Sequence, residues 1–72
     1  MSGHNALEEL NRESEIAHNG KILDFGNTVP TDGAAGYATG CLFLHTDGGD
    51  GTSLYVNEGS STTADFNAIT VA

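Results

Sequence analysis

One stretch of sequence decides the fold: GYATGCLFLHTDGGDGTSLYVNEG, residues 36–59. Side chains that suit a pleated strand over residues 37–46 and 52–57 predict two β-strands. Asp47-Gly48-Gly49-Asp50-Gly51 lies between them, and its glycines can take the positive φ angles of a hairpin turn. Gly40, inside the first strand, predicts a bulge or a close backbone approach. The stretch therefore predicts an antiparallel hairpin.

The first strand of this hairpin is apolar on both faces. Successive side chains alternate, so Cys41, Phe43 and His45 point to one face. Leu42 and Leu44 point to the other. A strand of this kind is covered on both sides when folded. In a chain of only 72 residues, we expect the second cover to come from another subunit.

Shorter apolar runs extend the β region on either side of the hairpin. Residues 21–25 predict a strand, and residues 26–36 predict a loop. Residues 63–71 predict a closing strand, in which the opposite parity of Phe66 and Ile69 indicates a bulge or a twist near Asn67. The expected fold is mainly β: a small antiparallel meander or sandwich-like domain with four strands.

The N-terminal segment has a different, acidic character. Asn5 followed by Glu8 has the spacing of a helix capping box, and Asn19-Gly20 is typical of a helix end. The apolar stripe between these signals is thin, and an isolated helix of this length is marginal in water. Residues 1–20 are therefore predicted to be either a short helix or an extended arm that orders against a partner. Residues 21–72 form the predicted β domain.

The charge balance excludes several classes of partner. Ten acidic residues oppose only Arg12 and Lys21, which gives a formal net charge of −8. Nucleic acids and anionic membranes are bound through Lys and Arg, so neither is an expected partner. No apolar run approaches the roughly 20 residues of a membrane span, and no signal-peptide pattern is present. Synthesis and assembly in a cytoplasm are expected.

The sequence predicts no metal or cofactor. Cys41 is the sole cysteine, so it is predicted to be a buried thiol without an internal disulfide partner. His4, His18 and His45 are far apart, and none has zinc-finger spacing from the cysteine. The acidic turn over residues 47–51 lacks the ligand set and the helices of an EF-hand. It is predicted to be a solvated turn.

Catalysis is not expected either. The hydroxyl groups of residues 60–63 would need a base and an orienting partner to act as nucleophiles. His45 has apolar neighbours, which favours a packed or hydrogen-bonded histidine. The glycines form no phosphate-binding loop, and so short a chain has trouble enclosing a ligand cavity of roughly 300 Å³. We therefore predict a protein that acts by contact and is not an enzyme.

Contact residues are sought among the larger apolar side chains. Phe43 and Phe66 are expected to fill the core, whereas core and interface are equal options for Tyr37 and Tyr55. A chain of this size buries only about 60% of its unfolded surface, so support from other copies or a larger surface is expected. The candidate residues for a subunit or partner interface are Leu7, Leu10, Ile16, Tyr37, Phe43, Leu54, Tyr55 and Phe66.

Three runs of residues resemble a module of tailed-phage virion proteins: residues 36–44, 54–59 and 65–69. The pattern is an entry strand ending near a Thr-Asp turn, a Leu-Tyr-Val-Asn strand, a Glu-Gly turn and an aromatic-Asn-Ala close. Small head decoration (cement) proteins and some fibre proteins carry this module, commonly as trimers. The resemblance covers about half of the chain, residues 36–71, and does not include the acidic N-terminal segment.

The resemblance implies a capsid decoration protein on the outer surface of a phage head. It would be a homotrimer that clamps neighbouring subunits of the major capsid protein and stabilises the shell. Phe43, Leu54 and Phe66 would form the core and trimer centre. The N-terminal segment, with its apolar side chains, would reach along the shell or a neighbouring subunit and order as it binds.

The alternative implied by the same resemblance is a fibre or receptor-binding module. In that case the loops at residues 47–51 and 58–61 would contact host glycans. A receptor-binding fibre generally needs a long shaft and a separate tip, and neither fits in 72 residues. The length therefore favours decoration.

Overall fold

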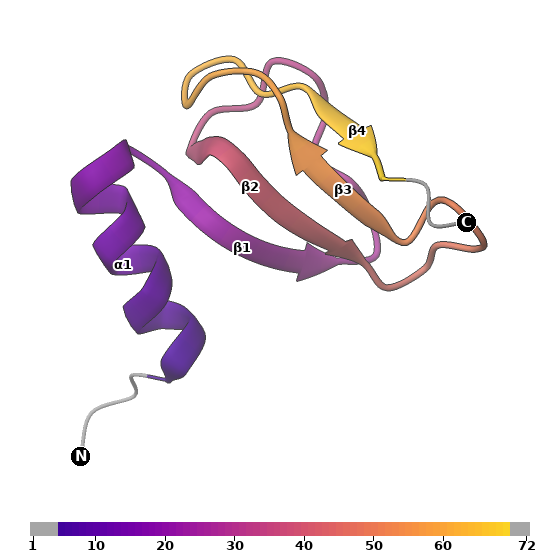
Figure 1. The fold of residues 1–72 in the computed structure, drawn as a ribbon, viewed down its shortest axis with the longest axis horizontal. Coiled ribbons are helices and arrows are strands. Elements are labelled where there is room, and N and C mark those ends of the chain that lie inside the picture. The colour runs from indigo at the N-terminus through magenta and orange to yellow at the C-terminus, as the bar shows by residue number, and fades with distance from the viewer. Residues whose placement is uncertain (1–4, 70–72) are drawn as a thin grey trace.

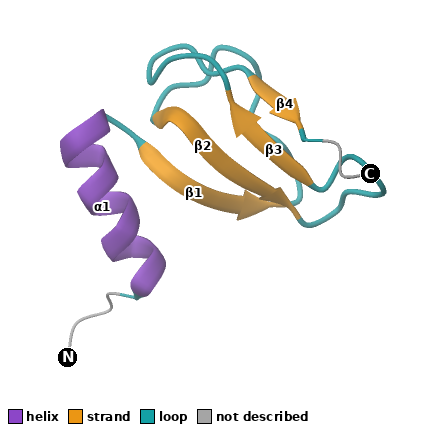
Figure 2. Cartoon of the chain, viewed as in Figure 1, coloured by secondary structure: helices purple, strands orange, loops and turns teal. Residues whose placement is uncertain are grey.

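The computed structural model describes residues 5–69 and shows a four-stranded sheet with one helix (Figure 1). The chain order is α1 (Ala6–His18), β1 (Lys21–Gly26), β2 (Tyr37–His45), β3 (Leu54–Asn57) and β4 (Phe66–Ala68). The strands lie side by side in the same order, and the helix stands beside β1 at one edge of the sheet (Figure 2). The domain is thus largely β with a single helix, which confirms the β-rich prediction.

The first two strands are parallel, whereas the other pairs are antiparallel. The expectation of a purely antiparallel meander is therefore wrong for β1 and β2. Residues 27–36 carry the chain from the end of β1 back to the start of β2, and Val29 and Ala34 pack against the core on the way. A crossover connection, which returns the chain to the starting end of the strand that it leaves, makes two neighbouring strands parallel.

The later strands are shorter than predicted. β3 begins at Leu54 rather than at Thr52, because the Thr52 hydroxyl accepts a hydrogen bond from the Gly49 N–H at 2.9 Å and closes the turn. β4 covers only Phe66–Ala68. The remainder of the strand predicted over residues 63–71 is irregular or lies outside the described residues.

The irregularity of the sheet lies in β2, at Gly40. This glycine has a φ of 87°, and the alignment of β1 with β2 shifts between Lys21 and Leu23. Glycine takes a positive φ without the steric cost of a Cβ, and the register shift fits the bulge, one of the two alternatives predicted at this position. β4 pairs regularly with β3, so of the two alternatives predicted near Asn67, a bulge or a twist, the bulge is wrong.

The N-terminal segment is helical from Ala6 to His18, as one of the two predicted alternatives required. The Asn5 side chain accepts a hydrogen bond from the Glu8 N–H at 2.9 Å, and the Glu8 carboxylate accepts one from the Asn5 N–H at 3.1 Å. Asn19 ends the helix in the left-handed region. Gly20 then passes so close to β2 that an added Cβ would meet its backbone. No helix within residues 5–69 is long and apolar enough to cross a membrane.

The core lies on one side of the sheet. Cys41, Phe43, Ala64 and Phe66 are buried there together. The Phe66 ring meets Tyr37 edge-on at 5.2 Å between ring centroids, and it meets Phe43 at 5.9 Å. Loops rather than a second sheet complete this core, which accounts for its small size.

A buried asparagine joins the parts of this small domain. Asn57 is 1% exposed, and its side-chain oxygen accepts hydrogen bonds from the N–H groups of Gly59 and Asp65 at 2.9 and 2.8 Å. Its amide nitrogen donates to the carbonyl oxygens of Tyr37 and Ala38 at 3.1 and 3.0 Å. One side chain therefore ties the end of β3 to the start of β2 and to the turn before β4. From the sequence, this residue was recognised only as the end of a strand.

The single cysteine is buried, as predicted. Cys41 is 0% exposed and forms no disulfide. Burial away from water raises the pKa of its thiol to about 11, and the nearby Asp24 carboxylate adds to this effect while Lys21 opposes it. The thiol is consequently neutral and enclosed at physiological pH.

Replacing Asn57 by aspartate should destabilise the fold by about 2–4 kcal/mol. A carboxylate keeps the two acceptor contacts but cannot donate to the Tyr37 and Ala38 carbonyl oxygens, and it buries a charge among them. Urea unfolding measures the change. Asn27→Asp, the same substitution at an exposed position, is the matched control and should lie within about 0.5 kcal/mol of the wild type. Equal losses for the two variants would contradict the role of Asn57.

Stability should fall at alkaline pH because of Cys41. The thiol ionises near 9.0 in the unfolded chain and near 11 in the folded one, so the unfolded state releases its proton first. The contribution of the neutral Cys41 thiol to the free energy of unfolding is complete below pH 9. It is lost as the pH rises to 11, which lowers that free energy by about 3 kcal/mol in total. Urea unfolding at several pH values should show this extra slope in the wild type but not in Cys41→Ala. Parallel profiles for the two proteins would contradict it.

Candidate functional site

The alignment of three strands places a set of apolar side chains on the face opposite the core. Residues directly opposite each other in neighbouring strands point to the same side of a sheet. Leu42 of β2 lies opposite Leu23 of β1 and Val56 of β3. Two residues further along β2, Leu44 lies opposite Phe25 of β1 and Leu54 of β3. We call this set the open face. It comprises Leu23, Phe25, Leu42, Leu44, Leu54 and Val56.

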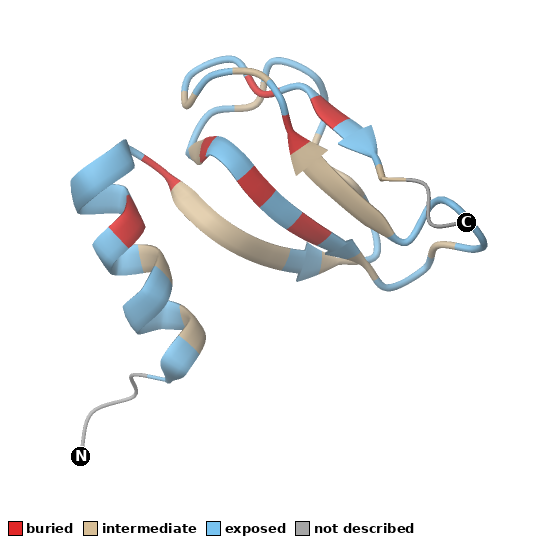
Figure 3. Cartoon of the chain, viewed as in Figure 1, coloured by how far each residue is buried: buried red, intermediate tan, exposed pale blue. Residues whose placement is uncertain are grey.

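Half of the open face is well exposed to solvent. Phe25 is 58% exposed, Leu42 38% and Leu44 45%, and the other three side chains are half-buried. Figure 3 shows the resulting alternation of buried and exposed residues along β2. The core side, by contrast, is covered by the connection over residues 27–36 and by the loop that precedes β4. Residues 5–69 therefore close one face of the sheet and leave the other accessible to a partner.

An open apolar face of this kind favours association. Single exposed apolar side chains are normal on protein surfaces, but contiguous groups of them mark contact sites. Burying the exposed parts of Phe25, Leu42 and Leu44 would contribute roughly 1 kcal/mol for each residue. Sheets bury such faces against one another in β-sandwiches. The open face can thus bind a second protein surface.

The open face is nevertheless small for an interface. Strands about 4.8 Å apart, with three residues of about 3.4 Å along each of three strands, give a footprint of about 150 Å². Stable complexes bury roughly 800 Å² on each partner. One pairwise contact through the open face is therefore weak. A lasting assembly needs several such contacts or a second contact surface.

None of the six residues of the open face is charged, although the chain has a net charge of −8. Asp24 lies opposite Phe43, hence on the core side, and its carboxylate is 3.5 Å from the Lys21 ammonium. Arg12 pairs with Glu9 on the helix at 3.1 Å. A partner can therefore dock on the open face without burying a carboxylate, which would be costly.

The predicted interface residues within the sheet fall in two places. Leu54 lies on the open face. Phe43 and Phe66 are buried in the chain's own core, and Tyr37 and Tyr55 are half-buried and packed against that core. These four aromatic residues are thus brought together around the core side rather than on the open face.

The remaining predicted interface residues lie on α1. Leu10 is 47% exposed and Ile16 is 75% exposed, whereas Leu7 is half-buried beside a groove between the helix and β1. Ile16 is the most exposed large apolar side chain among the described residues. Successive helix residues turn by about 100°, so Ile16 lies on the side of α1 opposite Leu7, and the three side chains offer separate apolar contacts rather than one contiguous patch.

Sequence reasoning missed Phe25, Leu42 and Leu44 as interface residues. The alternation along residues 41–45 already indicates that Leu42 and Leu44 lie on the other face of the strand from Phe43, so the sequence contains a signal for these two residues. Phe25 gave no such signal, because the side to which it points depends on the alignment of β1 with β2. That alignment is set by the crossover connection and by the bulge in β2.

His45 is a hydrogen-bonded histidine, as predicted. Its Nδ1 lies 3.0 Å from the Thr52 carbonyl oxygen and its Nε2 lies 3.2 Å from the Asn27 carbonyl oxygen. The ring also meets Tyr55 edge-on at 5.8 Å between centroids. It therefore links the hairpin loop to the connection after β1. Within residues 5–69, no three His, Cys, Asp or Glu side chains are grouped so that they could hold a metal ion.

Comparisons with known proteins found no matching family model, no matching curated protein and no matching solved structure.

Proposed function

We propose that this chain is a structural protein of a tailed-phage particle, a capsid decoration (cement) protein that binds the outer surface of the head and stabilises the shell. The observation that carries the proposal is the open face, an apolar sheet surface that the chain does not cover itself. The resemblance of residues 36–44, 54–59 and 65–69 to phage virion modules supports a phage particle as the assembly to which the chain belongs.

Self-association begins at the open face. Three copies turn their open faces toward a common axis and bury Phe25, Leu42 and Leu44, the most exposed members of the set. Each pairwise contact is small, but a closed ring gives every subunit two of them. Symmetry therefore multiplies a weak contact into a stable one. The homotrimer is part of the proposal.

The outward side of such a trimer can contact the shell. Leu10 and Ile16 keep their apolar side chains exposed on α1 and suit contact with the major capsid protein. The strong negative charge of the chain favours a shell surface that presents Lys and Arg. Many shallow contacts of this kind, repeated over the head, would resist the pressure of packaged DNA.

Replacing Leu44 by aspartate should abolish self-association while the fold is retained. Leu44 is 45% exposed, so the new carboxylate remains solvated in a single copy, but it would be buried between open faces in a trimer. Sedimentation velocity over a range of concentrations should show trimers for the wild type and single copies for Leu44→Asp. Binding to phage heads that lack their decoration protein should fall in parallel.

The matched control is Thr28→Asp, which adds the same charge at an exposed loop position away from the open face. It should self-associate and bind heads as the wild type does, and thermal unfolding checks that both variants are folded. A wild type that stays a single copy at all concentrations would contradict the proposal. A Leu44→Asp variant that self-associates and binds heads as the wild type does would contradict it as well.

A further inference from the structure

Helix α1 meets the sheet through a polar clamp. The Asn11 side-chain oxygen accepts hydrogen bonds from the N–H groups of Ile22 and Leu23 at 3.0 and 3.1 Å. Its amide nitrogen donates to the Leu23 carbonyl oxygen at 2.8 Å. A side-chain amide has the same donor and acceptor as a peptide group. Asn11 therefore occupies, on the edge of β1, the hydrogen-bonding positions that a neighbouring strand would use.

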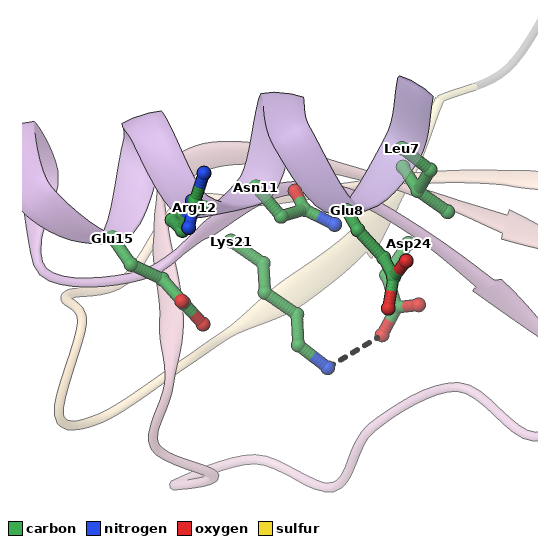
Figure 4. A pocket seen from close by; sticks show the side chains of 7 residues that line it. All are labelled: Leu7, Glu8, Asn11, Arg12, Glu15, Lys21 and Asp24. Atoms are coloured by element: carbon green, nitrogen blue, oxygen red, sulfur yellow. Dashed lines mark ion pairs between the residues drawn. The ribbon is translucent and has the colours of Figure 1, made fainter. Parts of the chain in front are cut away.

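The rest of the contact between helix and sheet is loose. Ser14 is the only buried residue of α1, and its hydroxyl has no hydrogen-bond partner among the described residues. A groove of about 420 Å³ lies along one flank of the helix, lined by Asn11 and the Lys21–Asp24 ion pair among others (Figure 4). A second groove of about 310 Å³ lies along another flank, beside Ser14. Close apolar packing does not hold the helix in place.

A helix attached in this way can leave the sheet at low cost. Ile16 is 75% exposed and Leu10 47% exposed in the docked helix, so on the helix itself undocking newly uncovers mainly the half-buried Leu7. The three hydrogen bonds of Asn11 are exchanged for hydrogen bonds to water, and the Ser14 hydroxyl gains a partner. Segments with few buried apolar contacts open at the lowest free energies in a protein. We therefore regard α1 as a removable cover of the β1 edge.

A ring of copies brings a specific occupant to this edge. Contacts in a cyclic trimer are heterologous, so one surface of each copy meets a different surface of the next. The strands at the two edges of the sheet are β1 and β4. When the open faces turn toward the axis, β1 of one copy comes to lie beside β4 of its neighbour.

We propose that the edge of β1 is a strand-binding site that α1 covers in the single copy, and that its occupant is the β4 edge of a second copy. This inference rests on the self-association in the proposed function, but not on binding to a capsid. Strand pairing between copies supplies the additional contact surface that the small open face requires.

Two variants test the edge pairing. Asn11→Ala removes the clamp, so the dissociation constant of the trimer should be about tenfold smaller than that of the wild type.

Ala68→Pro acts on the other edge. The Ile69 N–H donates to the Leu54 carbonyl oxygen, so alternation along the strand leaves the Ala68 N–H pointing away from β3. Proline removes this donor, and the constant should rise about tenfold. Glu13→Gln, an exposed change on the same helix, is the control and should leave the constant unchanged.

Sedimentation velocity measures these constants and separates the two proposals. A wild type that never associates defeats both. A trimer whose dissociation constant is unchanged by Asn11→Ala and by Ala68→Pro overturns the edge pairing but leaves the role of the open face intact.

A measurement on the wild type covers the case in which a variant does not fold. Hydrogen exchange should show that assembly releases the amides of α1 while the Leu23 N–H stays protected by its new partner strand. Amides of α1 that are protected equally in the single copy and in the trimer would overturn the inference.

Discussion

In β2, Cys41 and Phe43 face the core while Leu42 and Leu44 face away from it, and the rest of the molecule follows from this division. A strand that is apolar on both faces needs two covers. Residues 5–69 supply one: the connection over residues 27–36 and the loop before β4 close the core side. The helix, the only other element in that range, stands at the edge of the sheet rather than over its second face (Figure 1). The open face is thus the side of an apolar sheet that the described residues leave uncovered.

Polar contacts do much of the joining in so small a domain. Asn57 connects β2, β3 and the turn before β4 through hydrogen bonds from one buried side chain. Asn11 attaches α1 to the edge of β1 in a comparable way. The two clamps differ in burial, because Asn57 is 1% exposed whereas Asn11 is only half-buried at the margin of the domain. A fully buried amide is costly to leave unpaired, while one at the margin can exchange its partners for water. The first clamp therefore holds the fold, and the second can open.

The open face and the β1 edge together outline how such a chain could act as an assembly module. The open face provides an apolar driving force without a charge to bury, but its area is too small for a stable pair. Edge pairing would add directional hydrogen bonds and set the order of copies around a ring. The acidic surface keeps separate copies apart at long range and favours a basic docking partner. In the proposed decoration protein, these features combine weak individual contacts with symmetry.

Local chemistry was readable from the sequence by itself, because it depends on residues close together in the chain. The Asn5–Glu8 capping box, the hairpin turn after His45 and the buried thiol of Cys41 are predicted correctly, whereas the helix and the irregularity at Gly40 are each one of two predicted alternatives. The opposite orientation of Leu42 and Leu44 to Phe43 also follows from alternation alone. Tertiary structure alone decided that β1 runs parallel to β2, which side Phe25 takes, and that Asn57 is the buried junction of three segments. These features depend on how strands distant in sequence align, and no local pattern of side chains specifies that alignment.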